Sequence, residues 1–414
     1  MTKLEELIKE LCPNGVEYKT VGDVCDTITD YTAAGSFADI AKNVKYITDS
    51  IGFAQLVRTT DLKNSFSNNN RFVYVDEHAF RYLWRVNLNA EALIMPNVGN
   101  CGEVYYITEK IFPHEHNVLG PNAILVKSSF VNIRFLYHLF LTNEFQGSLA
   151  KIVSPTGQTK FNKTNFKEIK IPVPPIPVQE EIVRILDSFT ELTAELTAEL
   201  TARKKQYEYY RDKLLTASDF VIKKIALSDL FLTRNGYTPS TSNQEFWNSN
   251  DVPWFRMEDI RENGRVLSDA IQHVSKKAVK GNPFPPNSII VATSATIGEH
   301  ALITCESLAN QRFTYLMLRN EYKEKYNIKF LFYYCYLLDE YCKANLNQGN
   351  FASVDMKQFA KFEFPLLPLS IQNKIVQVLD NFDSICSDLK IGLPAEIEAR
   401  KKQYEFYRDK LLSF

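Results

Sequence analysis

The same fourteen-residue segment occurs twice in this chain, and this repeat constrains the fold more than any other feature. Ala202–Leu215 reads ARKKQYEYYRDKLL, and Ala399–Leu412 reads ARKKQYEFYRDKLL, so the copies differ at one position only. The stretches before them also match, because Ile171–Phe189 aligns with Phe364–Phe382 through shared proline, glutamine, leucine and aspartate positions. Repetition at this distance indicates two similar half-molecules of roughly 200 residues each. A duplicated chain suits a target that comes in two halves.

Each repeat module predicts a long helix. After the proline-rich lead-in that ends at Pro177, the chain contains no Gly or Pro until Gly236, and apolar residues recur in steps of three and four. This pattern predicts a helix of roughly 36 residues that ends at Leu215 and is about 54 Å long. In the second copy, Gly392 and Pro394 predict a kink or a break.

The apolar stripes of the two helices predict that they bury each other as an intramolecular antiparallel coiled coil with one stutter. The residues expected in this seam are Leu192, Leu196, Leu200, Tyr207 and Leu214 in the first helix and Ile375, Phe382, Leu389, Tyr404 and Leu411 in the second.

The first helix contains a smaller repeat, Thr-Ala-Glu-Leu, which occurs twice between Thr193 and Leu200. Four residues are slightly more than one helical turn, so one added unit moves the following segment by about 6 Å and rotates it by only about 40°. The unit can therefore adjust the length of the helix while the seam stays nearly in register. A helix-favouring filler sequence is the alternative interpretation.

The two remaining regions predict mixed domains that share a frame and differ between its landmarks. Short strands are expected at Phe72–Val75, Ala123–Val126, Ser288–Val291 and Arg312–Leu318, and helices at Arg134–Leu149 and Ile328–Asn345. We predict an α/β (α+β) fold with a pseudo-twofold internal repeat. The expected boundaries are 1–172 for the first domain, 173–218 for the first helix, 219–365 for the second domain and 366–414 for the second helix.

Charge and cysteine content restrict the possible partners and the compartment. The formal net charge is −1, so binding to DNA would require basic residues that are gathered locally or supplied by partner chains. The seven cysteines include no C-x-x-C pair, which favours reduced thiols in the cytoplasm. No apolar run approaches the length of a membrane span, and the amphipathic, charged N-terminal segment is not a signal peptide.

At this point the chain resembles the specificity (S) subunits of type I restriction–modification enzymes, over essentially its whole length. The frame carries the resemblance through the lead-ins with Gln179 and Gln372, the paired fourteen-residue segments and the Thr193–Leu200 units. Further matches in the second domain are Gly236–Ser240, Phe246–Trp247, Val252–Trp254 and Asn310–Gln311.

The resemblance implies a function in recognising DNA without chemistry on this chain. Each domain would read one half of a bipartite double-stranded target, and the coiled coil would set the spacer between the halves. Two methylation (M) subunits would bind S-adenosylmethionine and methylate adenine. Restriction (R) subunits, joined through the M subunits, would use ATP and Mg²⁺ for translocation and cleavage. No membrane partner is implied.

The residues agree that this chain is not an enzyme. It contains no G-x-x-x-x-G-K-[ST] loop for nucleotide phosphates and no G-x-G-x-x-G turn. His114-Glu-His116 lacks the spacing of a zinc-binding helix, so no metal is expected there. Catalytic residues, metal ligands and cofactors are therefore not expected on this chain.

DNA contacts are expected from polar and basic side chains in loops, because Arg, Lys, Asn and Gln read base edges and phosphates best. The candidates in the first domain are Arg58, Asn69, Arg71, Gln158, Lys160 and Asn162, and those in the second are Arg234, Tyr237, Arg256, Lys276, Gln311, Arg312, Gln348 and Asn350. The basic clusters Arg203–Lys205 and Arg400–Lys402 occur in both repeats, which favours a structural or partner-docking role over base reading.

Two other functional classes remain open from the sequence. A stand-alone bipartite DNA-binding regulator would bind its site tightly without partners. A coiled-coil scaffold would bind no DNA selectively.

Overall fold

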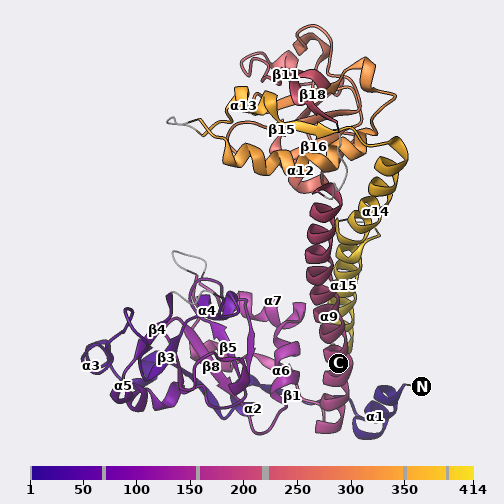
Figure 1. Ribbon diagram of the computed structural model, residues 1–414. Coiled ribbons are helices and arrows are strands. Elements are labelled where there is room, and N and C mark those ends of the chain that lie inside the picture. The colour runs from indigo at the N-terminus through magenta and orange to yellow at the C-terminus, as the bar shows by residue number, and fades with distance from the viewer. Residues whose placement is uncertain (1, 68–70, 155–158, 217–222, 348–351, 388–390) are drawn as a thin grey trace. The chain divides into compact units, whose positions relative to one another are not determined.

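The computed structural model describes residues 2–67, 71–154, 159–216, 223–347, 352–387 and 391–414 (Figure 1). The chain forms two compact units, and the first of them is discontinuous in the sequence. The first unit comprises Met1–Glu195 together with Glu398–Phe414, and the second comprises Leu196–Ile397. The fourteen-residue segments are therefore exchanged: the copy at the end of the sequence folds with the first domain, and the copy at Ala202–Leu215 folds with the second.

The first unit contains a mixed domain whose strands form a four-stranded sheet in the order β2-β8-β5-β6, a three-stranded sheet in the order β4-β3-β7 and the pair β1-β9. Its strands are β1 (Tyr18–Thr20), β2 (Thr27–Asp30), β3 (Ala54–Val57), β4 (Val73–Val75), β5 (Ala92–Pro96), β6 (Tyr105–Ile107), β7 (Asn117–Leu119), β8 (Ala123–Lys127) and β9 (Lys170–Pro172). Its helices are α1 (Lys3–Leu11), α2 (Val21–Val24), η1 (Tyr31–Ala34), α3 (Phe37–Asn43), α4 (Thr59–Lys63), α5 (Glu77–Tyr82), η3 (Trp84–Val86), η4 (Glu109–Ile111), α6 (Ile133–Phe140), α7 (Asn143–Ile152) and α8 (Lys163–Lys167).

The second unit repeats this plan, with a five-stranded sheet in the order β11-β18-β15-β16-β13, a three-stranded sheet in the order β14-β12-β17 and the pair β10-β19. Its strands are β10 (Lys224–Ala226), β11 (Phe231–Asn235), β12 (Val252–Phe255), β13 (Val266–Leu267), β14 (His273–Val274), β15 (Ser288–Ala292), β16 (His300–Ile303), β17 (Leu308–Ala309), β18 (Phe313–Leu318) and β19 (Glu363–Pro365). Its helices are α10 (Leu227–Leu230), η5 (Gln244–Phe246), α11 (Met257–Asn263), η6 (Lys276–Ala278), η7 (Asn320–Tyr322), α12 (Ile328–Ala344) and α13 (Met356–Lys361). In Figure 1, α12 lies along the sheet that contains β15 and β16.

In each unit the apolar residues form two core clusters. One cluster lies between the domain's larger sheet, its helices and the long helices, and the other fills the space between the two main sheets. The central strands β5 and β15 are buried along their whole length, as expected for apolar runs that are covered on both faces.

The predicted fold class is confirmed, with differences at the ends of helices. The first long helix, α9, runs from Ile176 to Thr216, because Pro177 is accommodated in the first turn, where a missing N–H costs nothing. The second long segment is broken as predicted, into α14 (Leu369–Ser387) and α15 (Leu393–Leu411). The single helix expected over Arg134–Leu149 is two helices, α6 and α7, because Thr142 caps α7.

The predicted strands are present as β4, β8, β15 and β18, with ends that differ by one residue at most. The boundaries that the sequence analysis gives for the two domains and the two long helices, 1–172, 173–218, 219–365 and 366–414, stay a prediction.

The long helices pack through the same aromatic contact in both units. In the first unit Phe189 of α9 stacks on Tyr407 of α15, with ring centroids 5.4 Å apart. In the second, Phe382 of α14 stacks on Tyr210 of α9 at 5.9 Å. Phe189 matches Phe382, and Tyr407 matches Tyr210, in the repeat. The exchanged copies are therefore structurally equivalent.

A buried glutamine joins each domain to its long helix. Gln179 accepts a hydrogen bond from the backbone N of Asn132 (2.9 Å) and donates to the backbone O of Pro174 (2.7 Å). Gln372 accepts from the backbone N of Asn327 (2.8 Å) and donates to the backbone O of Leu367 (2.7 Å). Gln179 thus pairs two backbone groups and Gln372 three, since Gln372 also donates to the backbone O of Lys325 (2.9 Å), where a domain helix meets the start of a long helix.

We expect Gln179→Ala and Gln372→Ala each to lower the free energy of unfolding of their own unit by about 1–3 kcal/mol, because buried backbone groups lose their partners. Chemical denaturation followed by circular dichroism measures this loss. Gln377→Ala is the matched control, since Gln377 lies on α14 and is exposed. Equal stability of Gln372→Ala and Gln377→Ala would show that the buried glutamine does not stabilise the junction.

Candidate nucleic-acid interface

In the second unit, backbone hydrogen bonds bring three loops to one edge of the domain. The N of Tyr237 donates to the O of Ala309 (2.8 Å), and the N of Asn310 donates to the O of Phe255 (3.0 Å). The ends of β11 and β12 and the β17–β18 loop therefore meet. Gly236 is required for this approach, because a Cβ there would lie 2.3 Å from the O of Ala309. We call this edge the polar edge of the second unit.

The polar edge carries several of the predicted DNA-contact residues. Gln311 is held in place by the hydroxyl of Thr238, which donates to its side-chain O. Arg312 is exposed, and its backbone N donates to the side chain of Asn310 (3.0 Å). Arg256 lies beside the Trp254 ring, with its guanidinium carbon 5.7 Å from the ring centroid. These side chains are the types that read base edges and phosphates.

Three other predicted residues lie around this edge. The Tyr237 hydroxyl donates to the O of Ala278 (3.3 Å) and accepts from the N of Lys280. These two bonds hold η6, which begins at Lys276, against the loop after β11. The Arg234 guanidinium lies 4.0 Å from the Phe284 ring centroid, and Arg234 is exposed on β11. Gln348 and Asn350 lie outside the described residues.

The first unit has the same backbone frame with different side chains. The N of Asn97 donates to the O of Asn122 (3.1 Å), as the N of Thr293 donates to the O of Arg312 (2.9 Å). The N of Gly120 donates to the O of Val57 (2.8 Å), which matches the Asn310–Phe255 bond. Asn97 and Asn122 therefore occupy the places of Thr293 and Arg312 in the second unit.

Sequence reasoning missed Asn97 and Asn122. Asn122 adopts a positive φ of 69° in the turn before β8, which asparagine tolerates better than most residues. The sequence around an asparagine in a turn does not reveal which other loop it will contact. The equivalence of these two asparagines to Thr293 and Arg312 appears only when the backbone hydrogen bonds of the two units are compared.

Arg58 and Arg256 begin equivalent helices but are held differently. The Arg58 side chain donates to Asp61 (2.7 and 3.1 Å) and to the backbone O of Arg71 (2.7 Å), and hydrogen bonding to Asp61 raises the pKa of Arg58. The Arg256 backbone N donates to Asp259 (2.6 Å), whereas the side-chain Nε of Arg256 has no hydrogen-bond partner within the described residues. This Nε is shielded from solvent and lies 4.0 Å from a carboxylate oxygen of Glu258, so it offers no donor to an external acceptor.

Two of the remaining first-domain candidates, Lys160 and Asn162, follow α7 in the chain. Lys160 is exposed, and its backbone pairs with Val98 in an isolated bridge. Asn162 caps α8 by accepting from the N of Asn165 (2.8 Å). Arg71 is exposed and holds Arg58 through its backbone O. Asn69 and Gln158 lie outside the described residues.

The residues expected in the coiled-coil seam differ in burial. Tyr207 and Ile375 are buried, as are Leu215 and Leu412 at the ends of the repeated segments. Leu192 is exposed, and Leu196 and Leu200 are half-buried. Leu214 and Phe382 pack against the core of the second unit, and Tyr404 and Leu411 against that of the first. Leu389 lies outside the described residues.

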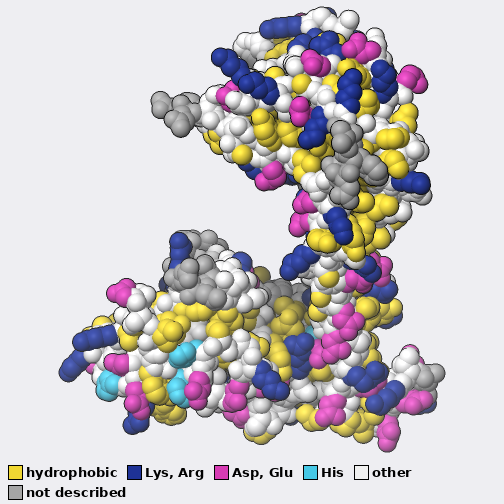
Figure 2. Space-filling model, in the orientation of Figure 1, with side chains coloured by type: hydrophobic (Ala, Val, Ile, Leu, Met, Phe, Trp, Pro, Cys, Tyr) yellow, Lys and Arg dark blue, Asp and Glu magenta, His cyan; other side chains and the backbone are white. Residues whose placement is uncertain are grey.

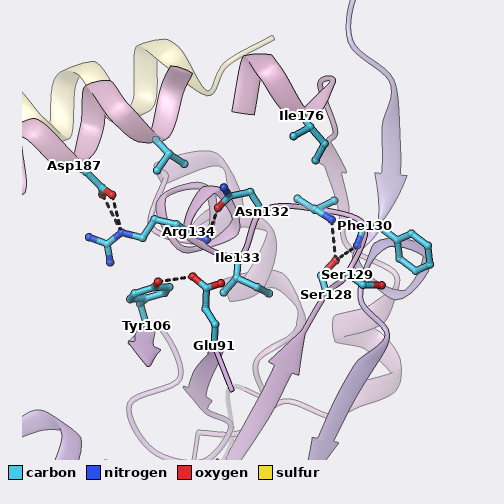
Figure 3. A pocket seen from close by; sticks show the side chains of 12 residues that line it. Glu91, Tyr106, Ser128, Ser129, Phe130, Asn132, Ile133, Arg134, Ile176 and Asp187 are labelled. Atoms are coloured by element: carbon cyan, nitrogen blue, oxygen red, sulfur yellow. Dashed lines mark hydrogen bonds and ion pairs between the residues drawn. The ribbon is translucent and has the colours of Figure 1, made fainter. Parts of the chain in front are cut away.

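A notch of about 680 Å³ marks the joint between the first domain and α9 (Figure 3). Arg134 of α6 pairs there with Asp187 of α9 (2.9 Å) and lies over the Tyr106 ring at 4.5 Å. Behind this pair, the buried His138 contacts Asp187 (2.8 Å) and the hydroxyl of Tyr404 (2.9 Å). Burial lowers the pKa of His138, so its ring is neutral near pH 7.

The second unit builds the same joint from different residues. Lys329 and Tyr333 of α12 both bind Asp380 of α14, each at 2.7 Å. Asp380 matches Asp187 in the repeat. Opposite charges and buried hydroxyls therefore fix both domains to their helices, and these groups act in structure rather than in chemistry.

Surface charge is uneven on the face drawn in Figure 2. Lys and Arg side chains are frequent over the part of the second unit that contains β11 and β18 in Figure 1, whereas histidines appear on the first unit. His116 stacks on Phe53 with ring centroids 4.5 Å apart, and His114 contacts the backbone O of Phe53 (3.0 Å).

The described residues contain no cluster of three or more His, Cys, Asp or Glu side chains that could hold a metal ion. All seven cysteines are free thiols. Within the described part of the chain, no helix is both long and apolar enough to cross a membrane.

Comparison with known proteins gives one family. The model of the type I restriction modification DNA specificity domain matches residues 13–203 and 221–399. The specificity subunit of the type I restriction enzyme EcoprrI of Escherichia coli is 51% identical over 213 residues, which are 50% of this chain and 53% of that one. The specificity subunit of EcoR124I/EcoR124II, also of E. coli, is 36% identical over 268 residues, covering 61% and 65% of the two chains. The matched part thus spans about half to two thirds of these relatives.

The fold has solved counterparts. A chain from a structure on complex assembly and conformational transition of the type I R-M system matches with a TM-score of 0.62 and 16% identity, covering 97% of this chain and 98% of that one. This likeness supports the architecture of two mixed domains and long helices.

Proposed function

Because this chain belongs to the family of type I restriction–modification DNA specificity domains, we propose that it is the DNA-recognition subunit of such a complex. Each domain reads one half of a bipartite double-stranded target, and the long helices set the spacer. One observation carries the two-half reading: the same backbone frame presents Asn97 and Asn122 in one unit and Thr293 and Arg312 in the other. A shared frame with different side chains is what two different half-sites require.

The catalytic steps belong to partner subunits. S-adenosylmethionine, ATP and Mg²⁺ bind to those partners, and this chain supplies the recognition. The complex acts on DNA in the cytoplasm, and R subunits join it through M subunits.

The exchanged repeats support two copies of one M subunit. Tyr209 and Phe406 occupy the same position in the repeat and are both 60% exposed. Lys213 and Lys410 lie 5.8 Å from these rings in both copies. Each unit thus presents the same exposed aromatic and basic surface, and two equal surfaces suit two equal partners. Mass measurement of the co-expressed complex should give two M subunits per chain, and a one-to-one complex at saturation would contradict this stoichiometry.

Mapping of methylated adenines in the host genome tests the function directly. With the gene present, one bipartite motif should be methylated, and the motif should be unmethylated when the gene is deleted. A stand-alone regulator would leave methylation unchanged and bind its site without partners. A scaffold would bind no DNA selectively. Unchanged methylation after deletion would therefore contradict the proposed function.

The polar edge of the second unit gives a prediction for single half-sites. We expect Gln311→Ala and Arg312→Ala to weaken recognition of one half-site by about 10- to 100-fold, because a good base contact contributes about 1–3 kcal/mol of discrimination. Methylation rates on duplexes with one half-site altered at a time measure the effect. Arg261→Ala is the control, since Arg261 is exposed on α11. Equal loss for both half-sites would rule out an assignment to one domain.

A further inference from the structure

A recess of about 670 Å³ opens in the first unit beside Asn97 and Asn122. Its walls are mainly apolar and include Phe37, Ile40 and Tyr46 from α3 and the following loop. Phe37 is 83% exposed and Tyr46 is 52% exposed. Aromatic rings gain much from burial, so two open rings beside a recess indicate an occupant that covers them.

The recess also contains an unpaired acceptor. The side-chain Oδ1 of Asn97 is shielded from solvent and has no hydrogen-bond partner in the described part of the chain. A shielded carbonyl without a donor is unfavourable, so an occupant that brings an N–H group is favoured. The backbone bond from the N of Asn97 to the O of Asn122 holds the two asparagines together. Asp30, on the lining, is neutralised by Lys163 (2.9 Å) and therefore does not repel a polyanion.

Its position connects the recess to the proposed DNA surface. Asn97 and Asn122 lie in the two loops whose counterparts in the second unit carry Thr293 and Arg312. Val98, which also lines the recess, pairs with the exposed Lys160. A recess at this place is next to the DNA if the proposed function holds.

Resting on the proposed function, we propose that this recess binds an adenine that has left the base stack of the first half-site. The adenine ring lies against Phe37 and Tyr46, and its exocyclic amino group donates to the Oδ1 of Asn97 once that amide has turned toward the recess. Stacking on aromatic side chains offsets the cost of unstacking the base. Asparagine is the side chain whose amide best matches the amino group and ring nitrogen of adenine.

Other occupants fit these features less well. Thymine has no exocyclic amino group, and its one donor is the ring N3–H, so it matches the asparagine amide less well than adenine does. A peptide of a partner protein could bind anywhere on the surface, so it would not explain why the recess lies beside the loops of Asn97 and Asn122. In the second unit Thr293 and Arg312 stand at the two asparagine positions, so we expect the unstacked base at the first half-site only.

The test uses the full chain in complex with its M subunits, after the target has been found by methylation mapping. Duplexes carry 2-aminopurine, which fluoresces more strongly when a neighbouring base leaves the stack, next to each adenine of the first half-site and its flanks on either strand, so that the adenine keeps its 6-amino group. The adenine that is methylated is scored separately, because the M subunit has to reach it. One further position should show a several-fold rise in fluorescence on binding.

The variants separate the recess from other causes. Phe37→Ala with Tyr46→Ala should abolish this rise and weaken binding by about tenfold or more. Asn97→Ala should remove the preference for adenine at that position. Ile51→Ala is the control, since Ile51 is 75% exposed in the same domain and does not line the recess. Thermal melting of each variant confirms that it is folded.

Specific binding with no rise beyond the methylated adenine would overturn this proposal and leave the proposed function intact. A rise that persists unchanged in the double aromatic variant, or a loss of affinity when thymine is replaced by uracil with no rise, would also overturn it. A complex that shows no sequence-specific binding at all would instead contradict the proposed function.

Discussion

Insertion of one more Thr-Ala-Glu-Leu unit after Leu200 is expected to change the recognised sequence by lengthening its spacer by one or two base pairs. The insertion adds about 6 Å to α9 and rotates the segment after Leu200 by about 40°, which a helix seam can absorb as a stutter. Base pairs along DNA are about 3.4 Å apart. The sequences of the half-sites should be unchanged, because the insertion alters no residue of either domain. Methylation mapping of the variant reads out the new spacer.

Insertion of two residues at the same place provides the contrast. It rotates the following segment by about 200° and would turn charged residues such as Lys204 toward the seam, so the assembled complex should be lost. Methylation of the original spacing by the four-residue variant would show that α9 is a tether and not a ruler.

Leu412→Ala is expected to destabilise the first unit and Leu215→Ala the second, each by about 2–5 kcal/mol, as is usual for a buried leucine. Leu412 is buried in the core of the first unit, although it lies at the far end of the sequence from that domain. Leu215, its equivalent in the repeat, is buried in the core of the second unit. Hydrogen exchange resolved by peptide measures the two units separately.

The two variants serve as controls for each other. Faster exchange should spread through the strands of the first domain in Leu412→Ala and through those of the second in Leu215→Ala. Loosening of the second domain by Leu412→Ala would contradict the exchange of the repeated segments.

Periodicity and repetition were enough to predict the long helices, their break near Gly392 and the mixed class of the domains. The antiparallel seam also implies that the copy at Ala399–Leu412 returns to the first domain. Because the two copies are nearly identical, their residues could not predict the different contacts that each makes, such as those of Tyr404 with His138 and of Leu412 with the first core.

For the candidate DNA-binding residues, too, the sequence could not predict the contacts that each side chain makes. Residue type correctly suggests that Arg58 is a strong hydrogen-bond donor, but its Nε and Nη2 already donate to Asp61 and to the backbone O of Arg71. Asn97 and Asn122 look like ordinary turn residues until their backbone bond is matched to that of Thr293 and Arg312. Competition among partners and equivalence between loops arise only in the folded chain.

The exchanged repeats also bear on how such a protein can change by inheritance. A genetic crossover anywhere within Ala202–Leu215 and Ala399–Leu412 alters only the position of Tyr209 and Phe406, and both side chains point largely into solvent. Every buried contact of the segment survives such an event. A gene of this design can therefore exchange one of its two domains in a single recombination step while the packing of the long helices stays intact.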